Sequence, residues 1–153
     1  MNRRNVLDLD TWATRGTRIL DEIQGIDVFA DVDTTAPWSA TSLNAAEQRM
    51  LTTWTSADDI RAEVRAQYEI FLGEGLRRRF NGSWARLEPE FLGETTPDTP
   101  IGVGIAYPDE SIDVVSSLVP QAFRNGTGTW WSTIFQATQE LLSTGTQPGT
   151  DRR

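Results

Sequence analysis

Apolar residues recur at every fourth position in the middle of the chain and predict one long helix from Ser56 to about Phe80. These positions are Ile60, Val64, Tyr68, Leu72, Leu76 and Phe80. Ser56 and Asp59 have the spacing of a capping box, and arginines in the last turn complement the helix dipole. Asn81-Gly82 supplies a left-handed C-cap. Ile70 adds apolar surface on a further side, so we expect this helix to be buried on several faces and the other elements to pack around it.

Glycines interrupt this helix although each costs about 1 kcal/mol relative to alanine. Gly75 lies inside the apolar arc, which predicts close approach by another element, either the strand that carries Gly102 and Gly104 or a neighbouring helix. Gly73 lies towards the edge of the arc and has less packing reason to be glycine. Replacement of Gly73 by alanine is therefore predicted to be neutral or stabilising.

Two shorter helices are predicted before the long one. The first covers residues 10–24, is weakened by Gly16 and ends at Gly25. The second covers residues 42–54 and starts with a capping-box spacing between Asn44 and Glu47. Its buried stripe comprises Leu43, Ala46, Met50, Leu51 and Trp54. The segment between these helices is predicted as either a short strand or an acidic loop.

After Gly82 the apolar period changes from helix to strand. Residues 83–87 and 101–107 alternate and predict two strands, separated by a proline-rich loop over residues 88–100. Residues 112–124 fit either a helix that is kinked or starts late, which we prefer, or a strand followed by a helical turn, because Pro120 removes a helical hydrogen bond. A last helix is predicted from a Thr129 cap to about residue 143, followed by a disordered C-terminal tail over residues 144–153.

These elements predict an α+β fold in one domain over residues 1–143. Four or five helices surround the long helix of about residues 56–80, with a small, mainly antiparallel sheet.

Composition excludes several classes of chemistry. The 153 residues include no Cys and no His, and all 14 basic residues are Arg. The usual Ser-His-Asp and Cys-His arrangements, zinc-thiolate sites and lysine Schiff bases are therefore excluded. We expect no cofactor and no metal. With His and Cys absent, any metal would need oxygen ligands, which means calcium or magnesium. Arginine in place of lysine also indicates a GC-rich bacterial genome of actinomycete type.

The net charge and the hydropathy of the chain indicate which classes of partner and which compartment to expect. A net charge of −8 argues against nonspecific binding to nucleic acid or to an anionic membrane. No apolar run approaches the length of a membrane span, and the N-terminal MNRRNVLDLD has no apolar segment of a secretory signal. We therefore expect a cytoplasmic protein whose partners include neither nucleic acid nor membrane.

Glu74 is the first candidate for chemistry. A carboxylate between two glycines in an apolar helix centre can have a raised pKa and act as a general acid or base. The structural alternative is a buried carboxylate satisfied by Arg78 one turn on, by another Arg or by a Trp N–H. A two-carboxylate glycosidase would need a second acid such as Glu88, Glu90 or Glu94.

Three acidic residues, Asp27, Asp31 and Asp33, invite a calcium site. Their spacing is not that of an EF-hand, so we interpret them as solvated loop residues.

Four further residues are candidates for contact with a ligand or partner. The loop with Gly126 and Gly128 opens a helix and has N–H groups that can hold an anion, although a flexible turn is the simpler interpretation. Trp38 and Trp130 are candidates for an exposed aromatic contact surface. The alternative for the Trp130-Trp131 pair is that one ring is core and the other half-buried.

One further pattern carries a resemblance. Leu72-Gly73-Glu74 is followed by Gly82-Ser83-Trp84, by a strand and by a two-helix tail. This arrangement, over about Ala62 to Leu142, resembles a group of small, uncharacterised bacterial proteins of actinobacterial type. The resemblance implies a compact intracellular domain and carries over no catalytic residues.

These observations favour a non-enzymatic protein-interaction module whose partner is another protein, in an immunity or regulatory setting. The alternative is a carboxylate-based hydrolase or small-ligand binder centred on Glu74. An apolar patch with Trp38 or Trp130 would favour the first. A deep pocket in which Glu74 converges with a second carboxylate would favour the second.

Overall fold

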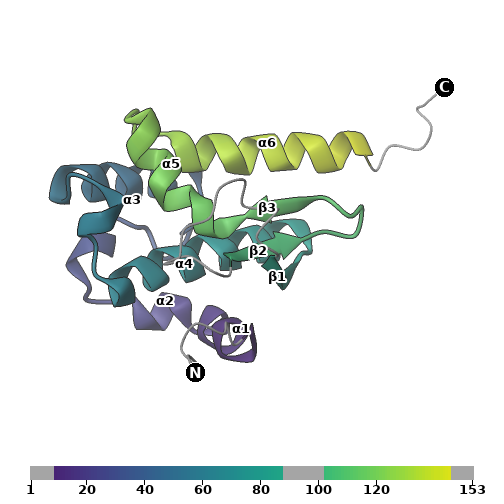
Figure 1. Cartoon of the computed structure of the whole chain (residues 1–153), viewed down its shortest axis with the longest axis horizontal. Helices are drawn as coiled ribbons and strands as arrows, with labels where there is room; N and C mark the ends of the chain where they lie inside the picture. Colours follow the sequence, from purple (N-terminus) through teal and green to yellow (C-terminus); the bar gives the residue numbers. More distant parts are fainter. Residues whose placement is uncertain (1–8, 88–101, 146–153) are drawn as a thin grey trace.

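A computed structural model describes residues 9–87 and 102–145 and shows an α+β fold, as predicted (Figure 1). The α-helices are α1 (Leu9–Thr17), α2 (Ile19–Glu22), α3 (Ala40–Thr53), α4 (Ala62–Phe80), α5 (Leu118–Asn125) and α6 (Trp130–Gly145). The 3₁₀ turns are η2 (Asp27–Phe29), η3 (Ala57–Asp59) and η5 (Val115–Ser117), and the strands are β1 (Ser83–Leu87), β2 (Gly102–Ala106) and β3 (Ile112–Val114). Within these residues, no helix has the length and apolar character needed to cross a membrane.

Helix α4 packs against elements from both halves of the chain. Helices α1 and α2 contact it on one side, and α5 and α6 on the other (Figure 1). Ile70 and Leu72, which point in different directions, are both fully buried, so the expected burial on several faces is confirmed. The hydrophobic core therefore surrounds the middle of this helix.

The start of α4 differs from the sequence prediction. Ser56 precedes η3 and its side chain caps no N–H group, and the backbone is extended at Ile60 with φ −86° and ψ 130°. The helix begins only at Ala62. The extended break has a packing reason, since it allows both Ala57 and Ile60 to enter the core. At the other end Asn81 adopts a left-handed conformation with φ 58°, as Asn81-Gly82 predicted.

The predicted helix over residues 10–24 is two helices. The backbone leaves the helical conformation at Arg18, between α1 and α2. The Arg78 guanidinium donates to the backbone oxygens of Gly16 at 3.4 Å and Thr17 at 3.3 Å. A partner from α4 therefore satisfies carbonyls at the end of α1 that the break leaves without helical N–H donors. The acidic segment that follows forms η2, whose Phe29 is buried, rather than a strand.

Helix α3 also begins earlier than predicted. Ser39 is its N-cap, and the Ser39 hydroxyl accepts from the Ser42 N–H at 3.1 Å. The spacing of Asn44 and Glu47 is therefore not a capping box, because both residues lie inside the helix.

The sheet has the order β1-β2-β3, and both pairs are antiparallel. Val103, Ile105 and Tyr107 share the buried face, as the alternation predicted. Gly104 has a neighbouring backbone close by, since a Cβ there would overlap the Asp113 carbonyl oxygen of β3. The predicted proline-rich loop lies outside the described residues.

The two alternatives for residues 112–124 are both partly right. β3 comes first, η5 follows, and α5 then starts at Leu118. Pro120 is the third residue of α5, within the first turn, where a missing N–H removes no helical hydrogen bond. Helix α6 continues to Gly145, so residues 144 and 145 of the expected tail are helical, and the rest of that tail lies outside the described residues.

Both glycines in the middle of α4 lie under an aromatic ring. A Cβ at Gly75 would overlap the Trp38 ring, and a Cβ at Gly73 would overlap the Trp84 ring. Close approach at Gly75 is as predicted, but the partner is the Trp38 side chain rather than a strand or helix. The expectation that Gly73 has little packing reason to be glycine is wrong, because Trp84 comes from β1 and closes on the opposite side of α4.

These contacts predict that alanine at either position destabilises the fold. Gly75→Ala should cost on the order of 1–3 kcal/mol through overpacking, beyond the gain of about 1 kcal/mol in helix propensity. Gly73→Ala should cost less, because the half-buried Trp84 ring has more room to move than the buried Trp38 ring. Urea denaturation of both variants measures their free energies of unfolding and shows which substitution costs more. Equal or increased stability of Gly75→Ala would show that the Trp38 contact is not tight.

Candidate functional site

The Glu74 carboxylate is fully buried and has donors on all sides. Arg77 donates from Nε at 3.0 Å and from Nη2 at 2.6 Å, and Arg78 donates from Nε at 2.6 Å. Trp84 Nε1 donates to the same carboxylate at 3.4 Å. Because Arg78 also reaches the end of α1 and Trp84 belongs to β1, the Glu74 cluster joins three elements.

This environment stabilises the charged form of Glu74. Burial raises the pKa of the Glu74 carboxyl, but hydrogen bonds from Arg77 and Arg78 outweigh burial and hold that pKa below its ordinary value. The raised pKa suggested by the sequence is therefore wrong. A general acid at neutral pH needs the opposite shift, so the contacts support the structural alternative. The candidate second acids Glu88, Glu90 and Glu94 lie outside the described residues.

A carboxylate with a raised pKa lies one turn earlier on α4. Burial raises the pKa of Glu69 to about 7, and the attraction and hydrogen bond of Arg65 offset only part of this. Arg65 is its ion-pair partner, at 3.6 Å. Among the described residues no second acid or nucleophile is bonded to Glu69, so it does not form a catalytic pair there.

Neither tryptophan candidate forms an exposed contact surface. Trp38 is 8% exposed and its Nε1 donates to the Phe71 backbone oxygen at 2.8 Å, so it is a core residue. Trp130 is half-buried, and its Nε1 donates to Gln121 Oε1 at 3.0 Å. Trp131 is fully buried, which confirms the alternative of one core ring beside one half-buried ring.

The N–H groups that follow the glycine-rich loop, at the start of α6, bind a carboxylate of the protein itself. Glu47 of α3, fully buried, accepts from the Trp131 N–H at 2.7 Å and from the Trp130 N–H at 3.0 Å. This carboxylate occupies the place at the helix N-terminus that an external anion would take. Gly126 ends α5 in a left-handed conformation, and Gly128 packs against the Gln48 side chain. Both glycines therefore shape the turn.

Sequence reasoning missed the role of Glu47, although a signal was present. Glu47 stands one turn after Leu43 and three residues before Met50, within the apolar stripe of α3. A carboxylate in such a stripe requires buried donors. Burial raises the pKa of Glu47, and the hydrogen bonds from Trp131 and Trp130 offset part of that effect.

Two carboxylates of the acidic segment after α2 have partners within the protein. Arg49 Nη1 lies 3.7 Å from Asp31 Oδ2, and Asp33 accepts from Thr35. Within residues 9–87 and 102–145 no group of three metal-ligating side chains of the His, Cys, Asp or Glu type comes together.

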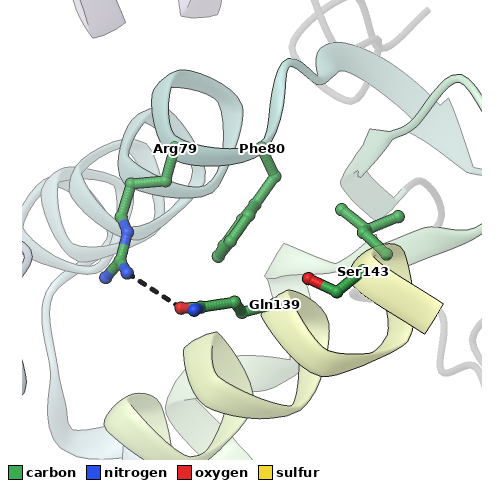
Figure 2. Close-up of a pocket in the computed structure, with 5 residues that line it drawn as sticks. Arg79, Phe80, Gln139 and Ser143 are labelled. Atoms are coloured by element: carbon green, nitrogen blue, oxygen red, sulfur yellow. Dashed lines mark hydrogen bonds between the residues drawn. The ribbon is translucent and has the colours of Figure 1, made fainter. Parts of the chain in front are cut away.

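A groove lies between the C-terminal end of α4 and the outer half of α6 (Figure 2), and a separate hollow of about 520 Å³ lies at α1 and α2, lined by Arg15, Arg18, Asp21 and Glu22. Within the groove, a hollow of about 490 Å³ is lined by Arg79, Phe80, Gln139, Leu142 and Ser143. A second hollow of about 200 Å³ adjoins it, shares Arg79 and Gln139, and reaches the start of α3. Its lining adds Ser39, Ser132, Phe135 and Gln136. We call the two hollows together the α4–α6 groove.

Arg79 stands where the two hollows meet. Its Nη1 donates to the Trp38 backbone oxygen at 3.1 Å. Its Nη2 donates to Gln139 Oε1 at 3.3 Å (Figure 2). The guanidinium carbon lies 5.3 Å from the Phe80 ring centre and 5.8 Å from that of Phe135. These contacts fix the orientation of an exposed cation. The sequence offered Arg79 only as a helix-dipole partner, because the residues that hold it come from distant segments.

Comparison of the chain with protein-family models, with curated proteins and with solved structures gave no match.

The Glu74 cluster predicts a pH-dependent effect on stability. Glu74→Gln should lower the free energy of unfolding at pH 7 by about 1–3 kcal/mol, because the two arginines lose their charged acceptor. The ordinary pKa is 4.5 and the folded-state pKa is lower, so this contribution is complete above about pH 4.5 and is lost as the pH falls through the folded-state value. Parent and variant should therefore converge in acid. Urea melts from pH 7 to pH 3 measure this, and a difference that is independent of pH would contradict it.

The Glu47 contacts predict a second effect on stability. Glu47→Gln should cost on the order of 1–3 kcal/mol, since an amide group replaces one acceptor and leaves a buried N–H at the start of α6 without its partner. Glu140→Gln on the exposed side of α6 is the matched control and should stay within about 0.5 kcal/mol of the parent. Thermal and urea melts compare them. Equal effects of the two substitutions would show that Glu47 does not hold α6.

Proposed function

We propose that this chain is a non-enzymatic protein-interaction module that contacts another protein through the α4–α6 groove. The observation that carries the proposal is the groove itself, in which a fixed arginine and aromatic and aliphatic side chains line adjoining hollows. Arginine and aromatic residues are enriched at protein interfaces, where they supply much of the binding energy. The resemblance to small bacterial proteins and the amino-acid usage favour a bacterial, cytoplasmic setting, in immunity or regulation.

Two features support binding to a protein surface. The polar lining residues Gln136 and Gln139 are exposed on α6 and can donate and accept hydrogen bonds. The groove follows the length of a helix rather than closing around one point, since its lining residues on α6 run from Ser132 to Ser143.

The surroundings of Glu74 argue against the alternative of a hydrolase or ligand site centred there. Its carboxylate is enclosed by Arg77, Arg78 and Trp84 and has no exposed surface. A substrate would have to displace these donors, which are the contacts that hold the charged form.

Site-specific photo-crosslinking in the native host tests the proposal. A photoreactive amino acid at Gln136 or Ser143, both in the groove, should give an adduct with the same partner protein. The matched control is Glu63, which is exposed in the first turn of the same helix α4 and about 20 Å or more from Arg79 by the helical rise. Mass spectrometry identifies the adducts. No adduct at either groove position, or equal adducts at Glu63, would overturn the proposed surface.

A further inference from the structure

Arg79 brings a positive charge to the groove that the described chain does not neutralise. The described ion pairs occupy Arg15, Arg49, Arg65, Arg77 and Arg78 with carboxylates, whereas none of them includes Arg79. Its partners are neutral, namely a backbone oxygen, an amide oxygen and two aromatic rings. The charge of Arg79 in this hollow is therefore not balanced by a carboxylate of the described residues.

The guanidinium has donors left for a ligand. It carries five N–H groups, and two of them are used, one to Trp38 and one to Gln139. The remaining donors belong to a planar fork whose orientation is already fixed by its two neighbours. Such a fork matches the two oxygens of a carboxylate, and prior orientation lowers the entropy cost of binding.

The other residues that line the hollow indicate which group of a ligand would lie beside a carboxylate bound to Arg79. Phe80 and Leu142 are half-buried and line the same hollow as Arg79, so they offer apolar surface to a neighbouring side chain. A free small carboxylate would leave this surface unused. An acidic residue followed or preceded by an apolar residue would use both parts of the hollow.

We propose that the α4–α6 groove binds a segment of the partner protein that presents an Asp or Glu carboxylate to Arg79 and an apolar side chain to Phe80 and Leu142. This inference rests on the proposed function and names the chemistry of the partner at the same site.

Selection of peptides on the full chain tests the inference. Phage-displayed random twelve-residue peptides are selected on the parent protein, and synthetic copies are titrated by fluorescence anisotropy. Enriched peptides should carry an acidic residue next to an apolar one. Replacing that Asp or Glu by Asn or Gln, which leaves the protein untouched, should raise the Kd at least about 10-fold, the scale of one charge-assisted hydrogen-bond pair.

Variants of the protein provide the complementary measurement. Arg79→Gln should raise the Kd of the acidic peptides at least about 10-fold, and Arg79→Lys should fall in between, because an ammonium keeps the charge but lacks the fork. Arg86→Gln, an exposed arginine on β1, makes the same change in net charge and should leave the Kd within about twofold. Thermal melts of each variant check that the fold is retained.

Several outcomes would overturn the inference. They are no enrichment, enriched peptides without acidic residues, equal binding to Arg79→Gln, or free acetate that competes as well as the peptides. Crosslinking separates this failure from failure of the proposed function. A partner adduct at Gln136 that persists unchanged in the Arg79→Gln background supports the interaction surface but refutes carboxylate recognition. Absence of the adduct in the parent refutes the surface itself.

Discussion

The packing of this protein depends on three consecutive residues of α4, Gly73-Glu74-Gly75. Each glycine leaves room for a tryptophan ring, Trp84 on one side and Trp38 on the other. The carboxylate between them accepts from the next turn of α4 and from Trp84 of β1. The two glycines together cost about 2 kcal/mol in helix propensity. Burial of two large rings offsets this cost, since each removes extensive apolar surface from water. The segments before and after α4 are thereby held against the same turn of one helix.

Two buried carboxylates connect this arrangement to the rest of the fold. Glu74 ties α4 to the end of α1 and to β1, and Glu47 ties α3 to the first turn of α6. Both are fully buried, and both have charged or backbone donors in hydrogen-bond range. Their pKa shifts have opposite signs because guanidinium groups surround Glu74, whereas only neutral N–H groups face Glu47. In this protein the acidic residues Glu47 and Glu74, although placed in apolar stripes, join separate elements of the fold. Their position in such a stripe does not indicate that they are reactive.

The α4–α6 groove depends on the contacts that position α6 against the rest of the protein. Glu47 holds the first turn of α6, and Asp113 of β3 accepts from Thr138 at 2.7 Å in its middle. Arg79 and Gln139 bridge the two helices farther along. With the helix fixed at these points, the side chains between them line hollows. The net charge of −8 disfavours the long-range approach of an acidic partner, so recognition at Arg79 would act through short-range contacts and specificity rather than through steering.

Features that depend on neighbours along the chain could be predicted from the sequence alone. The period of four predicted most of α4, Asn81-Gly82 its left-handed end, and the alternation of residues 101–107 the face that β2 buries. These signals are local, because the periodicity of side chains and the conformational preference of Asn and Gly act within a few residues. The structural alternative for Glu74 was also available locally, since its main partners lie three and four residues on.

Features whose partners come from other elements depend on how those elements pack together in three dimensions. Trp84 on Gly73 was not predicted because it depends on how β1 leaves α4, and the role of Glu47 depends on N–H groups 83 and 84 residues away. The orientation of Arg79 likewise depends on Gln139, 60 residues away. Apolar patterns show that a face is buried, but they do not specify what covers it. That choice is made by the shapes and donors that meet when separate elements pack.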